Sequence, residues 1–276
     1  MENKSIGKQV LVYGTLAFLL IFALFPLYWM LNTSFKSQGE IYNMTPSFWP
    51  QVFSWSAYEK LLTEKGFLSN IKNSLYVSLI VSFLSILFSM LAAYAISKLQ
   101  FKGRGFISRG ILYAYLMPRA VLFIPLYMLV NAIGLSNSVY GLMLIYPTIT
   151  IPYATWMLVS YFKSIPGEIE EAAMIDGCSR ARTMWSVIFP LAAPGLAATF
   201  IFAFTLCWSE YLYALVIVTK TSDKTITLGL SDMIVGDVFA WGPLMGGSII
   251  ASIPVIIMYL FTSKYMVSGM TVGGVK

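Results

Sequence analysis

The sequence holds few of the side chains that enzymes use for catalysis. It contains no histidine, and its two cysteines, Cys178 and Cys207, lie far apart along the chain. A histidine/cysteine metal site and a histidine general base are therefore excluded. A glycine-rich loop ending in Gly-Lys-Ser/Thr, which would cradle a nucleotide phosphate, is also absent. We expect no catalytic residue, no metal and no cofactor in this chain.

The densest group of carboxylates lies in residues 163–177, a segment with the pattern of a short helix. Ser164 can cap its start and Pro166 fits a first turn, while Gly177 offers a left-handed position for its end. The acidic residues complement the positive end of the helix dipole: Glu168, Glu170 and Glu171. One face combines small and acidic side chains, which suits insertion into a socket on another protein: Ile169, Ala172, Ala173 and Asp176.

A second helix is predicted directly after this segment. Ser179 can cap it, and Pro190 and Pro194 are expected to stop it. Apolar residues recur at helical spacing and should press on the protein's own membrane helices: Ala181, Met184, Trp185 and Ile188.

The elements that must position this loop are membrane-spanning helices. Hydrophobic residues make up 58% of the 276 residues and charged residues 11%, well below the charged fraction of about 25% in soluble domains. A helix needs about 20 apolar residues to cross a bilayer. Six stretches qualify in a single all-α transmembrane domain, 1–276: residues 11–31, 75–96, 111–133, 140–162, 196–218 and 244–265.

The distribution of basic residues predicts the orientation of these spans. The formal charge of +6 comes from short clusters between apolar runs, which fits membrane orientation better than nucleic-acid binding. Most of these residues fall on the side of both termini: Lys4, Lys8, Lys98, Lys102, Arg104, Arg109, Lys163, Arg180, Arg182, Lys264 and Lys276. We therefore expect a multi-pass membrane protein with both termini in the cytoplasm.

The loop 163–194 resembles that of a known family. Three separated elements carry the resemblance: Glu171-Ala172-Ala173, then Asp176-Gly177, then Ile188-Phe189-Pro190-Leu191 with Pro194. They strongly resemble the loop by which bacterial ABC importer permeases dock on their ATPase subunits. One departure is Cys178, where the family usually has alanine.

The resemblance covers nearly the whole chain and looks closest to the sugar branch, the permeases of the maltose transporter type. Thr33–Lys36, Asn73–Leu75 and Trp208–Glu210 look like family positions, although Ser209 stands where asparagine is common. The tail 268–276 is also similar to that of the branch, where it reaches toward the ATPases. This resemblance implies the type I importer architecture, with six transmembrane helices and a cytoplasmic coupling helix. It also implies a location in a bacterial or archaeal cell (inner) membrane.

The same resemblance implies partners and roles. The partners would be a second related permease, two ATPase subunits that hold ATP and magnesium, an extracytoplasmic solute-binding protein, membrane lipid and a di- or oligosaccharide. The residues that would couple to the ATPases are Glu170, Glu171, Ala172, Ala173, Met174, Asp176 and Gly177, supported by Pro190 and Pro194.

Two charged residues lie inside predicted spans, where an uncompensated charge is costly. Arg119 and Glu210 should each face protein or water. We expect a structural role for Arg119 and a pathway or gating role for Glu210, with Trp208 as its neighbour in the pathway.

Other functions stay open at the level of the sequence. The solute could be a phosphorylated polyol, an amino acid or a peptide. An intramembrane enzyme would need a convergent catalytic pair, and none stands out among the serine, acidic, lysine and tyrosine residues. A secondary transporter would run on an ion gradient without ATPases.

Overall fold

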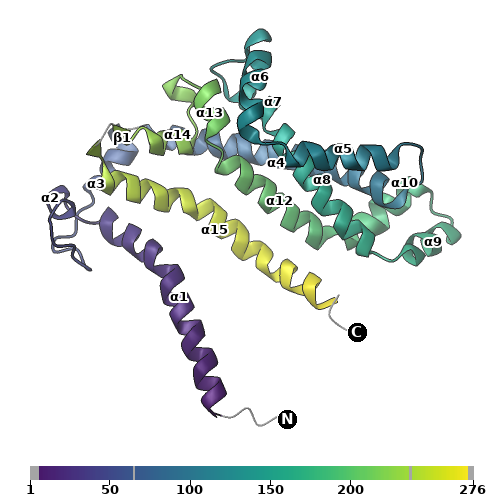
Figure 1. The fold of residues 1–276 in the computed structure, drawn as a ribbon, viewed down its shortest axis with the longest axis horizontal. Coiled ribbons are helices and arrows are strands. Elements are labelled where there is room, and N and C mark those ends of the chain that lie inside the picture. The colour runs from purple at the N-terminus through teal and green to yellow at the C-terminus, as the bar shows by residue number, and fades with distance from the viewer. Residues whose placement is uncertain (1–5, 65, 236–237, 273–276) are drawn as a thin grey trace. The chain divides into compact units, whose positions relative to one another are not determined.

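The computed structural model describes residues 6–64, 66–235 and 238–272, and this part of the chain is almost entirely helical (Figure 1). The longer helices are α1 (Ile6–Ser34), α4 (Phe67–Lys98), α5 (Arg104–Leu116), α6 (Arg119–Ala132), α8 (Pro147–Ser164), α9 (Gly167–Ile175), α12 (Ala193–Trp208) and α15 (Trp241–Val272). The end of the predicted tail contact, 273–276, lies outside the described residues.

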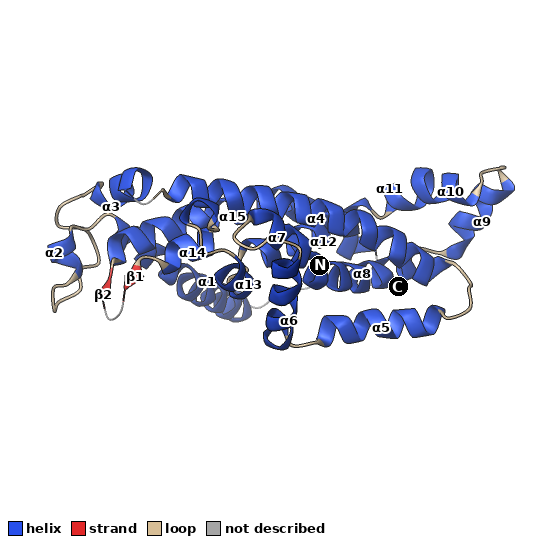
Figure 2. Ribbon diagram, turned by 90° about the horizontal axis from the view of Figure 1, so that it is seen from above, coloured by secondary structure: helices blue, strands red, loops and turns tan. Residues whose placement is uncertain are grey.

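Short helical segments and one hairpin complete the fold (Figure 2). The short segments are α2 (Gln38–Ile41), α3 (Ser56–Glu59), η1 (Lys60–Glu64), α7 (Val139–Ile145), α10 (Arg180–Thr183), η2 (Met184–Ile188), α11 (Phe189–Leu191), α13 (Leu212–Ile217), η3 (Thr221–Asp223) and α14 (Ile226–Ser231). The strands β1 (Ile234–Val235) and β2 (Val238–Phe239) pair antiparallel, with Ile234 opposite Phe239. The predicted all-α class is confirmed.

Four helical stretches among the described residues are long and apolar enough to cross a membrane: Gly7–Ser34, Phe67–Lys98, Val139–Ser164 and Trp241–Thr262. Two bent pairs would raise the number to six if each pair forms one span: Arg104–Leu116 with Arg119–Ala132, and Arg180–Leu191 with Ala193–Trp208. The six predicted spans fall at the upper end of this range.

The span predicted at residues 111–133 is not one continuous helix. α5 ends at Leu116, α6 begins at Arg119, and the two helices are bent by 97°. The residue before a proline avoids the helical region, and Met117 accordingly has φ −66° and ψ 128°. Pro118 therefore breaks this stretch.

The span predicted at residues 196–218 is also interrupted. α12 ends at Trp208 and α13 begins only at Leu212. The Glu210 carboxylate accepts hydrogen bonds from the backbone amides of Tyr213 and Ala214, as an N-cap side chain does. A new helix therefore starts within the apolar run.

The chain forms two compact units. Unit 1 comprises Met1–Leu68 and Leu230–Ile253, and unit 2 comprises Ser69–Gly229 and Pro254–Lys276. The single domain expected from the sequence therefore stays a prediction.

Unit 1 folds its first loop onto the end of α1. The Ser34 and Tyr58 hydroxyls lie 2.9 Å apart. The ring of Phe35 packs at centroid distances of 5.1–5.3 Å against three aromatic side chains: Phe53, Trp55 and Tyr58. Offset and edge contacts of this kind stabilise a small core.

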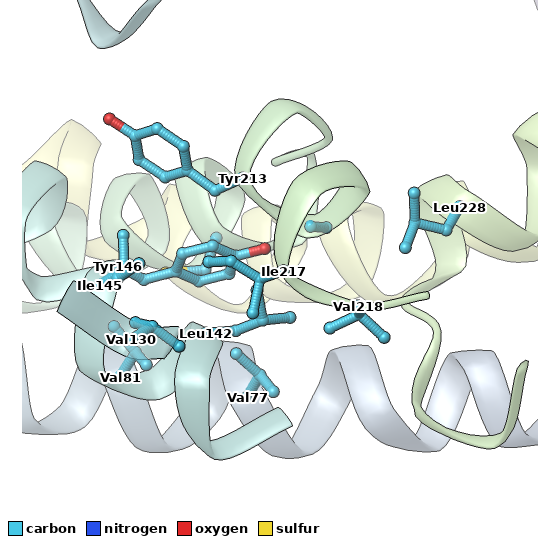
Figure 3. Close-up of a cluster of buried hydrophobic side chains, with 12 residues drawn as sticks. Val77, Val81, Val130, Leu142, Ile145, Tyr146, Tyr213, Ile217, Val218 and Leu228 are labelled. Atoms are coloured by element: carbon cyan, nitrogen blue, oxygen red, sulfur yellow. The ribbon is translucent and has the colours of Figure 1, made fainter. Parts of the chain in front are cut away.

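Unit 2 has two buried clusters. The first joins α4, α6, α7 and α13, and Figure 3 shows the side chains that meet there, including Val77, Val130, Leu142 and Ile217. The second joins α4 and α8 to the segment η2–α11 through Met90, Tyr94, Leu158, Phe162, Ile188 and Phe189. The second cluster supports the loop described below.

One face of α4 is polar and buried. Six side chains on this face have 5% or less of their surface exposed: Asn70, Ser74, Ser78, Ser82, Ser85 and Ser89. Ser85 pairs with the Thr150 hydroxyl at 2.6 Å, and Ser89 donates to the Ile151 carbonyl at 3.1 Å. Small hydroxyl side chains let helices approach closely in a membrane and bond across the contact. This face therefore ties α4 to α8.

Candidate functional site

The acidic segment forms the predicted short helix, α9. Pro166 is its N-cap residue, with φ −56°, and Glu168 and Glu170 lie in the first turn. The prediction that Ser164 caps α9 is wrong. α8 continues through Ser164, so the Ser164 hydroxyl donates instead to the Tyr161 carbonyl of α8 at 2.7 Å.

α9 ends in a Schellman motif at Gly177. The Cys178 amide donates to the Ala173 carbonyl at 3.0 Å, and the Gly177 amide donates to the Met174 carbonyl at 3.1 Å. Gly177 has φ 85°, a conformation that glycine adopts at little cost. The prediction that Gly177 ends the helix through a left-handed position is confirmed.

The two faces of α9 differ in exposure. α9 contacts α10 and η2, and its covered residues are Ala173, only 9% exposed, and the half-buried Ile169. Ala172 and Asp176, expected on the same face as these two, are exposed. Asp176 lies at the C-cap, beyond the last helical turn. Ile175 is 86% exposed and Met174 40%. The helix therefore ends in an uncovered apolar tip flanked by carboxylates.

The carboxylate of Glu170 faces the protein's own α4. Its Oε2 lies 3.7 Å from the Lys98 Nζ, and the Glu170 side chain is only 14% exposed. By contrast, Glu168 and Glu171 on the same helix are exposed. Neighbouring carboxylates of α9 therefore have different surroundings.

The predicted second helix forms as α10, η2 and α11 in succession. The Ser179 hydroxyl accepts a hydrogen bond from the Arg182 amide at 3.3 Å, which confirms the predicted cap. Phe189 packs with its ring centroid 4.9 Å from Trp185, 6.0 Å from Phe162 and 6.2 Å from Tyr94. Phe189 thus joins the loop to both α4 and α8.

The loop returns to the membrane helices through a bend between two prolines. Arg180–Leu191 and α12 meet at an angle of 73°, with Pro190 and Pro194 on either side of Ala192. Pro194 has no amide hydrogen to bond to the carbonyl of Pro190, so the helix cannot continue straight through. The second helix therefore runs through Pro190 and ends at Leu191, before Pro194, and the support role of the two prolines stays a prediction.

Glu210 lies inside unit 2 and is bonded to protein groups. It is 6% exposed and accepts hydrogen bonds from the Tyr146 hydroxyl at 3.0 Å, the Tyr213 amide at 3.0 Å and the Ala214 amide at 3.1 Å. These contacts hold α13 against α7.

Trp208 lies two residues before Glu210, and Arg119 contacts Tyr213, whose amide donates to Glu210. Trp208 is 5% exposed and stacks on Phe204 with centroids 5.6 Å apart. The Arg119 carbonyl accepts from the Tyr213 hydroxyl at 3.2 Å. Arg119 also lines a cavity of about 100 Å³, together with Ala114, Tyr115, Met117, Leu122, Thr148, Ile149, Tyr153, Leu206 and Tyr213. A pathway role for Glu210 and Trp208 stays a prediction.

Residues 85–268 match the family described as binding-protein-dependent transport system inner membrane component. The match includes α9, the second helix and the proline bend. The chain belongs to this family. It is a multi-pass permease of the ABC importer class, and its family is one of membrane transport components, not enzymes.

Relatives of this permease match it over almost its whole length. It is 36% identical to the inner membrane ABC transporter permease protein YcjP of Escherichia coli, over 99% of each chain. It is 34% identical to the diacetylchitobiose uptake system permease protein DasC of Streptomyces coelicolor, over 99% of each chain. It is 33% identical to the trehalose/maltose transport system permease protein MalG of Thermococcus litoralis, over 100% of this chain and 99% of the relative.

The fold of the permease is also that of a solved transporter chain. The structure of a bacterial ABC transporter involved in the import of the acidic polysaccharide alginate matches with a TM-score of 0.80 and 23% identity. The match covers 96% of this chain and 98% of that chain. The expected importer architecture is confirmed.

The sequence predicts most of the loop residues but gives no contact role to Ile175 or Lys98. Ile175 is an apolar side chain next to the C-cap of α9, and this position is itself a signal for a contact surface. Lys98, at the end of α4, enters the sequence analysis only as a basic residue that indicates orientation. Its pairing with Glu170 joins residues far apart in sequence, and no local pattern reports such a contact.

Proposed function

We propose that this permease carries a di- or oligosaccharide across the cell membrane in an ATP-driven importer. The exposed, capped helix α9 supports the ATP-driven part, since a separate protein must cover its apolar tip. The relatives support the cargo, because full-length relatives are named for diacetylchitobiose and for trehalose/maltose transport.

In this proposal the permease works with three kinds of partner protein. A second related permease completes the path, two ATPase subunits rest against α9, and a binding protein delivers the sugar from outside. ATP and Mg²⁺ are bound by the ATPases. α9 and both termini face the cytoplasm, which the basic residues near α9 support under the positive-inside rule, with Arg180 and Arg182 among them.

The coupling residues proposed for ATPase contact are those on the exposed side and end of α9: Glu171, Ala172, Met174, Ile175, Asp176 and Gly177. When the ATPases close on ATP, they move α9 as a rigid body. Ala173 and Ile169 transmit the motion to the second helix, and Phe189 passes it to α4 and α8. The membrane helices then open the path outward, and hydrolysis resets them.

Uptake by reconstituted vesicles tests the proposal. Vesicles would contain this permease, its neighbouring permease and ATPase, and the sugar-loaded binding protein outside. We expect uptake of labelled disaccharide that requires internal ATP and is unaffected by dissipating ion gradients. Uptake driven by an ion gradient without ATP would refute the ATP-driven part. ATP-dependent uptake of a phosphorylated polyol and no sugar would refute the cargo.

A further inference from the structure

Lys98 is the last residue of α4 and holds two groups at the start of the loop. Its Nζ donates to the Ile165 carbonyl at 2.7 Å and lies 3.7 Å from the Glu170 Oε2. Ile165 is the C-cap residue of α8, and Glu170 lies in the first turn of α9. One ammonium group therefore connects the ends of three helices.

The surroundings strengthen this connection. The Lys98 side chain is 9% exposed and that of Glu170 14%, so water screens the pair less than it screens a surface ion pair. Each charge also suits its helix end, because a cation stabilises the C-terminus of α4 and an anion the N-terminus of α9. The phenol of Tyr94, one turn back along α4, lies beside the same carboxylate.

The Lys98–Glu170 pair can link the movement of α9 to that of α4. α9 contacts α10 and η2, and the ring of Phe189 connects that second helix to α4 through Tyr94. The Lys98–Glu170 pair instead connects α9 directly to α4, whose buried serine face bonds to α8. A displacement of α9 must carry α4 with it or break a largely buried ion pair.

We propose that Lys98 and Glu170 are positioning residues that transmit the movement of α9 to α4. This inference rests on the proposed function, and it assigns Glu170 to an internal link, while the exposed Glu171 is left to face the ATPase. Removing the link should leave ATP hydrolysis intact but reduce its response to the sugar-loaded binding protein.

The test measures how far the loaded binding protein stimulates ATP hydrolysis by the complete reconstituted complex. The variants are Lys98→Gln, Glu170→Gln, the double variant and Lys98→Arg. Lys163→Gln is the control, since Lys163 is an exposed lysine in the last turn of α8. We expect each single glutamine variant to lower the stimulation about three- to tenfold. The double variant should be no worse than either single variant, because both remove one link. Lys98→Arg and Lys163→Gln should stay close to wild type.

Three outcomes would overturn the inference. Stimulation could be unchanged in Glu170→Gln, the losses could add in the double variant, or the nearly isosteric Glu170→Gln could prevent assembly, which would place the pair in folding. If Lys98→Gln alone fails to assemble, the stimulation measured for Glu170→Gln and Lys98→Arg tests the inference. A failure of the proposed function is distinguished by the wild-type complex, which would then show no ATP-dependent uptake at all.

Discussion

Tyr146, the C-cap residue of α7, donates its hydroxyl hydrogen to the Oε2 of Glu210 at 3.0 Å, across 64 residues of sequence. Both side chains are buried, and the same carboxylate accepts the Tyr213 and Ala214 amides at the start of α13. The carboxylate thus replaces the helical hydrogen bonds that are lost where α12 ends. This arrangement favours a positioning role for Glu210 over direct contact with solute.

Glu210→Gln should lower the stability of the complex. One carboxylate oxygen becomes an amide group that faces a donor, so at least one buried hydrogen bond is lost, at a cost of about 1–3 kcal/mol. Tyr146→Phe removes a single bond and should cost less, about 0.6 kcal/mol. Thermal melting of the detergent-purified complex measures both. A Glu210→Gln complex with unchanged melting but altered sugar uptake would instead support the pathway role.

Gly177→Ala should weaken coupling through backbone strain alone. A Cβ at this position would meet no atom within 4 Å, but φ is 85°, where an L side chain costs about 1–2 kcal/mol. Gly177→Asn should be milder, because asparagine tolerates this region. Gly167→Ala is the control, since Gly167 also has open space and carries no positive φ. ATP-dependent uptake, normalised to membrane-inserted permease, should fall for Gly177→Ala and not for Gly167→Ala. Equal uptake in both variants would contradict the role of the Schellman turn.

Gly195→Ala should destabilise the contact between α8 and α12. The added Cβ would lie 2.6 Å from ring atoms of Tyr161, so the ring or the helix must shift. Overpacking of this kind costs about 1–3 kcal/mol. Gly110→Ala, on an open part of α5, is the matched control. A melting temperature of Gly195→Ala equal to that of the control would show that the two helices do not pack this closely.

The serine face of α4 should respond more to size than to lost hydrogen bonds. Ser85→Ala removes the bond to Thr150, about 0.6 kcal/mol, while Thr150 keeps its bond to the Tyr146 carbonyl. Ser85→Val adds volume at a fully buried position and should cost about 1–3 kcal/mol. Melting of the two complexes tests this order, and a more stable valine variant would contradict close packing here.

The parts of the fold that the sequence predicted depend on local patterns. The caps of the loop helices at Gly177 and Ser179 follow from residue types at fixed offsets, and the structure has both. Hydropathy located the apolar stretches but not their interruptions. Pro118 gave a local signal for the bend in the third stretch, because a proline inside an apolar run bends its helix.

The missed features depend on contacts between distant residues. The break after Trp208 arises because Glu210 caps α13 and bonds to Tyr146. The charge of Glu210 is visible in the apolar run, but its contact with the distant Tyr146 is not. Lys98 and Glu170 are likewise brought together only when α4, α8 and α9 have packed. Periodicity and capping rules describe single helices, so such pairs lie beyond them.

We propose that α9 docks on an ATPase subunit through its exposed tip. Photo-crosslinking can test this contact, with benzoylphenylalanine in place of Ile175 in the assembled complex. In the control, benzoylphenylalanine replaces Met44, an exposed residue of the loop after α1. We expect a crosslink from position 175 to the ATPase and none from position 44. A complex that transports sugar yet gives no ATPase crosslink from position 175, or gives one from position 44, would contradict it.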